Sequence, residues 1–150
     1  MERMKLANRR ELGSTYVEMV IVLPLLLILL FGIAEFTRLF IQAQIVHCAA
    51  REATREATLF RPDCDGAKNA AENAAEDIIQ ANAITRGSSF DVDVENACDS
   101  EEPARVTVYL DTEFLVLARL VNRLTGGSLT DEPFRLSSTL IMRNEAHAGG

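Results

Sequence analysis

The sequence predicts an α+β protein in which one long N-terminal helix carries a small antiparallel sheet, and three observations support this. An apolar stretch near the N-terminus continues into a helical repeat that extends to about residue 58. A second segment, from about residue 65, has the same helical spacing of apolar residues. Beyond residue 90, apolar residues alternate with polar ones, which is typical of strands with one buried face. A chain of 150 residues has room for one such domain.

The first element contains a segment long and apolar enough to cross a membrane. Residues 19–34 form sixteen positions without a charge, and residues 14–17 extend this run past a single glutamate, Glu18. About 20 apolar helical residues span the ~30 Å of hydrocarbon in a bilayer. Residues 1–13 carry a net charge of +2, whereas the rest of the chain carries −9. The positive-inside rule therefore predicts a single span with a cytoplasmic N-terminus and everything after Glu35 outside.

Beyond the apolar run, the helical stripe continues without a breaker. Its apolar positions, spaced alternately by four and three residues, are Leu39, Ala43, Val46, Ala50, Ala53 and Ala57. A helix over about 14–58 would be roughly 65 Å long, with about half of it beyond the bilayer. Such a spine requires another part of the chain packed along it.

The rest of the chain, from about residue 63 to 150, is predicted to form a compact α+β head. Pro62 stops the first helix, and Asp65 with Gly66 opens a second that ends at Gly87. The apolar positions of this second helix are Ala67, Ala71, Ala74, Ile78 and Ala81.

Three strands follow, with period-two alternation in each. They are expected over 90–95, 106–111 and 134–143, and a short helix is expected near 114–124. A three-stranded sheet with one apolar face can be covered by the protruding half of the first helix. The sequence therefore predicts an α+β roll on a stalk.

Glycine and glutamate at the start of the apolar helix have the strongest functional implication. Gly13 lies where the basic leader meets this helix, and Glu18 is a carboxylate inside it. A charge within the membrane costs a few kcal/mol, so it normally has a partner or a task. Cleavage after Gly13 would free the α-amino group of Ser14, about one turn from Glu18. In a bundle, the carboxylate of one subunit could then meet the amine of its neighbour.

The N-terminal part resembles the TadE-like pseudopilins of tight-adherence (Flp-type) pilus systems. The stretch RRELGSTYVEMVIVLPLLLILLFGIAEFTRLFIQAQIVHCAAREATREA carries this resemblance over nearly fifty residues. The matching elements are the basic residues before Gly13, Val17-Glu18, Pro24 in the apolar run, Gly32 with Glu35-Phe36, and Ala49-Ala50-Arg51-Glu52. The C-terminal stretch LSSTLIMRNEA is similar to the closing strand of the family.

This resemblance implies a minor pilin or pseudopilin that a prepilin peptidase processes, with Gly13 and Ser14 flanking the cut. It also implies that Glu18 is needed for assembly and that Pro24 lets the helix bend. The partners would be other pilin or pseudopilin subunits and the pilus assembly machinery, in a system that supports adhesion. The expected location is the bacterial inner membrane, with a periplasmic or extracellular pilin-like head, or the pilus itself. Met19 departs from the phenylalanine usual after the glutamate.

An alternative interpretation places a general signal peptidase cut after Ala34. Gly32-Ile33-Ala34 has small residues at the two positions that this peptidase reads. The product would be a secreted or tethered binding domain beginning at Glu35, without a filament role. Glu18 would then be an unexplained cost. Glu35 could pair with Arg38 or with a neighbouring subunit, although a solvated carboxylate is the simpler expectation.

The cysteines favour a disulfide over a metal site. Cys48, Cys64 and Cys98 are too widely spaced for a paired zinc motif. Cys64 precedes the second helix and Cys98 follows the first strand, both where oxidation is permitted, so we expect these two to pair. Cys48 would remain free or pair between chains.

No pattern in the sequence predicts an enzyme, a cofactor or a metal site. His47 and Cys48 are adjacent on a helix and therefore point in different directions, without a third group at useful spacing. The acidic residues Asp91, Asp93, Glu95, Asp99, Glu101 and Glu102 could suggest calcium, but they lack a recognisable loop spacing and fit a solvated strand edge better. The acidic balance of the head opposes binding to nucleic acid.

Overall fold

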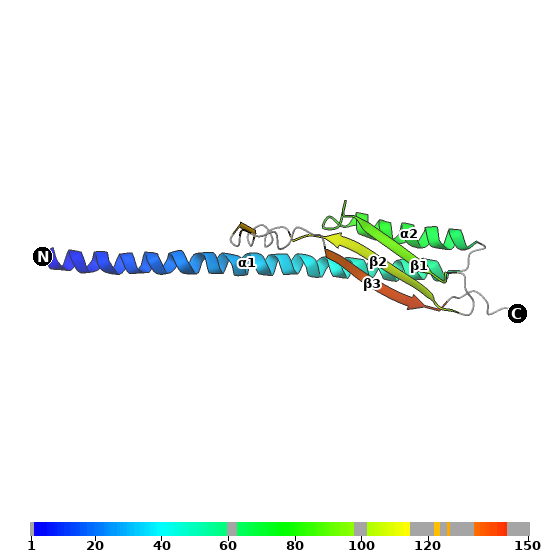
Figure 1. Cartoon of the computed structure of the whole chain (residues 1–150), viewed down its shortest axis with the longest axis horizontal. Coiled ribbons are helices and arrows are strands. Elements are labelled where there is room, and N and C mark those ends of the chain that lie inside the picture. The colour runs from blue at the N-terminus through cyan, green and yellow to red at the C-terminus, as the bar shows by residue number, and fades with distance from the viewer. Residues whose placement is uncertain are drawn as a thin grey trace.

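The structure is a computed structural model that describes the chain in several stretches. They are residues 2–59, 63–97, 102–114, 122–123, 126 and 134–143, with the backbone alone for residues 2–15. Two helices and three strands follow in the order α1, α2, β1, β2, β3. The predicted α+β class is confirmed: a long N-terminal helix and a second helix lie on one face of a three-stranded antiparallel sheet (Figure 1).

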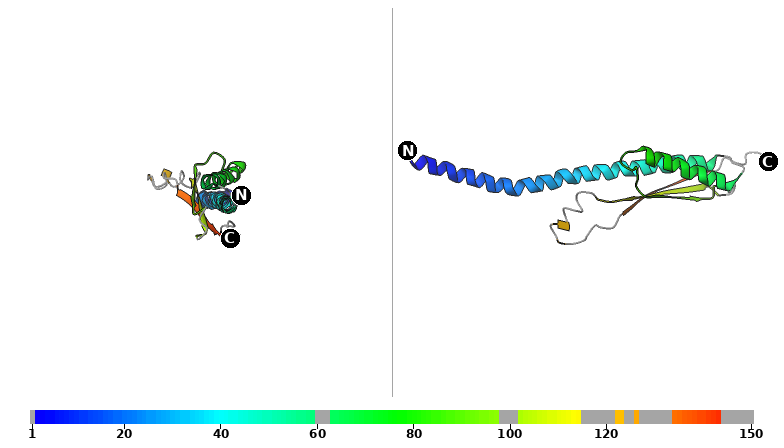
Figure 2. Two further views of the ribbon diagram at one scale, coloured as in Figure 1. Left: turned by 90° about the vertical axis from the view of Figure 1, so that its right-hand side faces the viewer. Right: turned by 90° about the horizontal axis from the view of Figure 1, so that it is seen from above.

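Helix α1, Glu2–Thr58, is continuous, but its two halves lie in different surroundings. Its N-terminal half extends away from the rest of the molecule, and its C-terminal half lies alongside α2 and the sheet (Figure 1). Pro24 lies inside the helix without ending it, and Figure 2 shows that α1 bends gently in its N-terminal half. The helix begins at Glu2, earlier than the predicted start near Ser14, so the leader residues before Ser14 belong to the same helix.

Helix α2, Cys64–Ala81, is capped at both ends by polar side chains. The Asp63 carboxylate accepts a hydrogen bond from the Gly66 backbone amide at 3.0 Å, which satisfies a free donor of the first turn. Asn82 ends the helix in an extended conformation, and the Thr85 hydroxyl donates to the carbonyl oxygen of Ile79 at 2.7 Å. The prediction that this helix reaches Gly87 is therefore wrong, since a turn occupies the residues after Asn82.

The sheet has the order β1-β2-β3, with both pairs antiparallel. Strand β1 is Phe90–Glu95, β2 is Ala104–Thr112 and β3 is Phe134–Met142. In the register, Val94 lies opposite Val106, and Val108 lies opposite Ser138. Helix α1 packs across β2 and β3, while α2 packs mainly against α1 and reaches β1. The sheet is covered on one face, as predicted.

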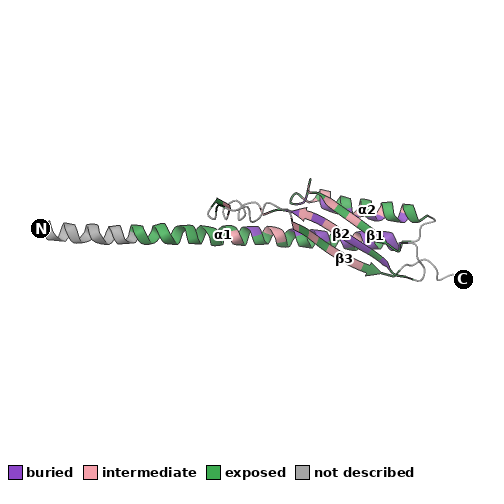
Figure 3. Cartoon of the chain, viewed as in Figure 1, coloured by how far each residue is buried: buried purple, intermediate pink, exposed green. Residues whose placement is uncertain are grey.

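The core lies between the distal half of α1, helix α2 and the sheet. Its buried apolar residues are Val46, Ala49, Ala50, Ala53, Ala57, Ala67, Ala71, Ala75, Ile79, Val94, Ala97, Val106, Val108 and Leu110. Alanines allow the two helix backbones to approach closely, and the larger branched residues come mainly from the sheet. Burial in Figure 3 is confined to this half of the molecule.

Two details of the predicted stripes are wrong. On α1, Ala43 is exposed, and Gln42 beside it is fully buried. On α2, Ala75 and Ile79 are buried, whereas Ala74 and Ile78 are half-buried and Ala81 is exposed. The other members of the stripes are mostly buried as predicted: Val46, Ala50, Ala53 and Ala57 on α1, and Ala67 and Ala71 on α2. The short helix predicted near 114–124 falls mostly outside the described residues, where only Asn122 and Arg123 are helical.

Candidate functional site

The apolar segment of α1 is exposed along its length. From Tyr16 to Phe31 every residue is exposed, and no part of the most apolar 18-residue window is buried. By length and composition, this is the one helix among the described residues that could cross a membrane, and it lies near the N-terminus. A core helix of a soluble protein would bury such a stripe against the rest of its chain. The finding therefore suggests membrane anchoring.

The predicted processing and assembly residues lie on this free half of α1. Gly13 and Ser14 are helical in their backbone, Glu18 is exposed, and Pro24 lies within the exposed segment. The head is packed on the other half of the helix (Figure 3). These positions can thus meet lipid, a peptidase or another subunit without rearrangement of the head. Their roles stay predictions.

Beyond the apolar segment, an ion pair lies at the base of the head. The Glu35 carboxylate is only 5% exposed, and its Oε1 lies 3.5 Å from Nη1 of Arg38. The same nitrogen donates to the backbone oxygen of Glu113 at 3.0 Å. The expectation of a solvated Glu35 is therefore wrong. The pairing with Arg38, considered as the alternative, is observed, and it links α1 to the end of β2.

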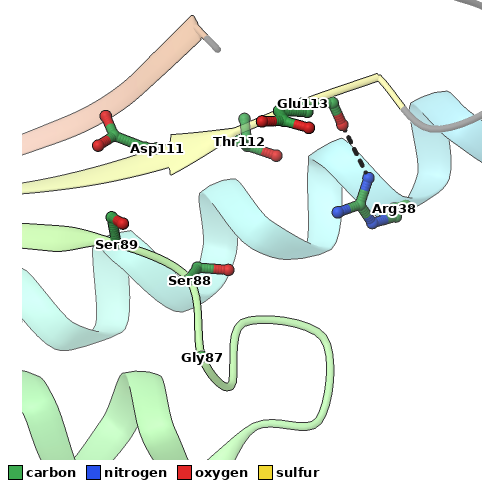
Figure 4. A pocket seen from close by; sticks show the side chains of 7 residues that line it. All are labelled: Arg38, Gly87, Ser88, Ser89, Asp111, Thr112 and Glu113. Carbon is green, nitrogen blue, oxygen red and sulfur yellow. Dashed lines mark hydrogen bonds between the residues drawn. The ribbon is translucent and has the colours of Figure 1, made fainter.

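A polar cavity of about 350 Å³ adjoins this link. Three chain segments line it: Arg38 of α1, the turn residues Gly87, Ser88 and Ser89, and Asp111, Thr112 and Glu113 at the end of β2 (Figure 4). Figure 4 shows the Arg38 guanidinium directed at the Glu113 carbonyl. This cavity was not predicted, because segments so far apart in sequence show no shared pattern.

Next to the cavity, a buried polar contact ties the sheet to the helix. The Thr112 hydroxyl donates to Oε1 of Gln42 at 2.7 Å, and both side chains are almost completely buried. Among the described residues, Nε2 of Gln42 has no hydrogen-bond partner. A buried donor without a partner lowers stability, so the Gln42 amide is an unfavourable group at this position.

The outer face of the sheet is polar and held by ion pairs. Arg135 Nε donates to Oδ1 of Asp111 at 2.9 Å, and this hydrogen bond raises the pKa of the guanidinium above its ordinary value. The Arg135 guanidinium also lies 5.5 Å from the centre of the Tyr109 ring. Arg105 pairs with Glu95 at 3.6 Å. Of the acidic residues predicted to form a solvated strand edge, Asp91, Asp93 and Glu95 are exposed on β1.

Acidic side chains also line a second depression, of about 460 Å³, between α1 and α2. They are Glu52 and Glu56 of α1 and Asp77 of α2. Arg55 donates to Glu52 Oε1 at 2.7 Å, so part of this charge is compensated on the same helix. Among the described residues, no group of three or more His, Cys, Asp or Glu is placed to hold a metal ion.

The cysteines differ in state. Cys64, the first residue of α2, is disulfide-bonded, whereas Cys48 on α1 is free and exposed. Cys98 lies outside the described residues, so its pairing with Cys64 stays a prediction. His47, next to Cys48, contacts strand β3: its Nδ1 lies 3.1 Å from the Ser138 hydroxyl, within hydrogen-bonding distance.

Comparison with known proteins finds one family similarity, and it lies along the long helix. The family model described as TadE-like protein matches residues 13–55, a segment that lies entirely within α1 and begins at Gly13. Neither a curated protein nor a solved structure matches the chain. The match covers the exposed apolar segment, the Glu35–Arg38 pair and most of the helix surface that packs on the head. Along this helix, the chain is similar to the TadE-like family.

Proposed function

We propose that this protein is a membrane-anchored minor pilin or pseudopilin of a tight-adherence (Flp-type) pilus system, and that it acts by assembly and not by catalysis. The single observation that carries the proposal is the match to the TadE-like family, which suggests involvement in these systems. The exposed apolar half of α1 supports the same conclusion, because a filament subunit needs an anchor that can exchange lipid for neighbouring helices.

In the proposed mechanism, a prepilin peptidase cuts after Gly13 on the cytoplasmic side of the inner membrane. The new α-amino group of Ser14 carries a positive charge below its pKa near 8. Glu18 of a neighbouring subunit pairs with this amine, which offsets the cost of a carboxylate in hydrocarbon. Pro24 removes one hydrogen-bond donor from the helix and lets α1 adjust as subunits pack. The head remains outside the membrane.

Substitution of Glu18 tests this proposal. Glu18→Gln keeps the shape of the side chain and removes its charge, so we expect normal insertion in the membrane but loss of incorporation into pili. Glu72→Gln is the matched control, because Glu72 is an exposed carboxylate on α2. Membrane fractionation measures insertion, and immunodetection in sheared pili measures incorporation. Unchanged pilus formation and adhesion in Glu18→Gln would favour a tethered binding domain instead.

A further inference from the structure

We infer that heads join side by side, with the open edge of β3 in one copy pairing with the open edge of β1 in the next copy to form one continuous sheet. The partner is therefore a second copy of this chain. The relative direction of the copies rests on the proposed membrane anchoring and assembly. The inference adds a contact between heads to the proposed pairing of Ser14 with Glu18.

The two outer strands of the sheet have open edges. The order is β1-β2-β3, so β1 and β3 each have one edge that faces away from β2 (Figure 1). Over the stretches of chain that the structure describes, neither of these edges pairs with another strand. An open edge presents unpaired backbone N–H and C=O groups, which are a template for a further strand. Strand β3 contains no proline to block such pairing.

The inner faces of these two strands are incompletely covered. In the central strand the apolar inner-face residues are fully buried, as Val108 is. The outer strands have apolar residues that pack against the core but are only half-buried, namely Phe90, Val92, Leu136 and Leu140. Pairing of β3 with β1 of a neighbour would bring these side chains together and remove more of their apolar surface from water.

The outer faces of the two strands are complementary in charge. The outer face of β1 is acidic, and its exposed residues are Asp91, Asp93 and Glu95. The outer face of β3 has a cation, two hydroxyl groups and no carboxylate, and its exposed residues are Arg135, Ser137, Thr139 and Ile141. Two β1 edges would repel each other, whereas β1 beside β3 places carboxylates next to hydrogen-bond donors. The charges therefore favour a head-to-tail contact between unlike edges.

Membrane anchoring sets the direction of the joined strands. Copies with the same topology hold α1 in the same direction, so their heads point the same way. Strands β1 and β3 are both antiparallel to β2, so they are parallel to each other within and between such heads. The helices follow the same order, since α2 reaches β1 while α1 packs across β2 and β3. The added α2 would thus lie beside the flank of α1 where His47 contacts Ser138 of β3.

The most favourable register places Asp91 of the added strand beside Arg135. Arg135 donates to Asp111 through Nε at 2.9 Å, which leaves its terminal nitrogens for a second carboxylate. Both remaining carboxylates then lie beside hydroxyl donors, in the pairs Asp93 with Ser137 and Glu95 with Thr139. On the inner face of the sheet, the same register places Val92 beside Leu136.

This register offsets neighbouring copies along the strands. Within one sheet, Asp91 and Ser137 lie in the same row, both opposite Tyr109. Asp91 of the added copy lies beside Arg135 instead, which is a shift of two residues, or about 7 Å. Because the two joined edges differ, the contact can repeat without closing. Repetition of an offset contact of this kind builds a helical filament.

Disulfide cross-linking of the full chain tests the inference. All variants carry Cys48→Ser, which removes the free, exposed cysteine. The test variant adds Asp93→Cys and Ser137→Cys, which the register places side by side, and two further variants carry only one of these substitutions. The matched control combines Ser137→Cys with Asn73→Cys, because Asn73 is exposed in the depression between α1 and α2. Membranes and sheared pili are oxidised and analysed on non-reducing gels.

We expect the test variant to form a ladder of dimers, trimers and longer species, because every chain carries both edges. Its cross-linked fraction should be several-fold above that of the control and of the single variants. If the test variant enters pili but cross-links no more than the control, the pairing of heads is wrong and the assembly proposal stands. Dimers of the variant with Ser137→Cys alone would indicate a two-fold contact between β3 edges and would also overturn the inference. If the chain with Cys48→Ser alone is absent from pili, the assembly proposal fails, and the ladder in membranes decides the pairing of heads.

Discussion

Gln42 and Thr112 form a buried polar contact that should stabilise the attachment of the sheet to the helix. Thr112→Val keeps the volume of the side chain but removes the hydroxyl that meets Gln42 Oε1 at 2.7 Å. Because Gln42 then has buried polar atoms without this partner, we expect a loss of about 1 to 3 kcal/mol in the free energy of unfolding. Urea unfolding of the detergent-solubilised chain, followed by circular dichroism, measures it.

The double variant Gln42→Leu with Thr112→Val serves as the control. Replacing both partners by apolar groups removes the unpaired amide together with the hydrogen bond, so stability should return close to that of the original chain. If the double variant is less stable than Thr112→Val alone, the contact is not the origin of the effect.

The burial of single charged or amide side chains is the feature that the sequence predicts least well. The sequence predicts a solvated carboxylate at Glu35, yet Glu35 is buried and pairs at 3.5 Å with Arg38, which in turn donates to the Glu113 carbonyl. From the sequence, Gln42 is a polar residue beside the apolar stripe of α1. In the structure it is buried and accepts a hydrogen bond from Thr112 of β2. The partner of Gln42 lies 70 residues away in the sequence, and the carbonyl that holds Arg38, the partner of Glu35, lies 75 residues from Arg38.

At the scale of elements, close packing of α1 depends on small side chains. Ala53 is fully buried, whereas Ala43 on the same helix is exposed. Ala53→Leu adds volume where the surrounding core has no space, so we expect a loss of about 1 to 3 kcal/mol and a lower Tm. Ala43→Leu should change stability by less than about 0.5 kcal/mol. Thermal unfolding of both variants checks this, and equal effects would contradict the observed orientation of the helix.

The predicted Cys64–Cys98 disulfide would join the start of α2 to the chain beyond β1. Such a bridge restricts the unfolded chain, and its removal by Cys98→Ser should cost about 2 to 4 kcal/mol. Cys48→Ser is the matched control, because Cys48 is free and exposed and its replacement should leave stability unchanged. Peptide mapping under non-reducing conditions identifies the pairing directly. A peptide that links Cys48 to either of the other cysteines would contradict it.

Periodicity predicted the existence and type of the elements better than their orientation. Helix α2 contains two alanine stripes one position apart, Ala70 with Ala74 and Ala71 with Ala75, followed by adjacent isoleucines. Both stripes are equally apolar, so composition cannot decide which one faces α1. The three strands were predicted nearly to their ends, because alternation fixes both the strand and its buried face.

For the whole molecule, the division of α1 into a free half and a packed half follows from composition. The free half is apolar all around and can be stable only in lipid or among other helices. The packed half has a mixed composition and a stripe of small residues that the head covers. The sequence predicted this division, and with it the location of Glu18 and Pro24. It did not predict the cavity near Arg38, which requires three distant segments to meet.

Processing after Gly13 is the central claim about the whole molecule, and the mature N-terminus tests it most directly. Mass spectrometry of the protein isolated from its native membrane would identify the first residue. We predict a mature chain that begins at Ser14, which would supply the amine that Glu18 requires in the proposed assembly. A mature chain that begins at Glu35 would mean a secreted domain without its anchor, and it would contradict the account.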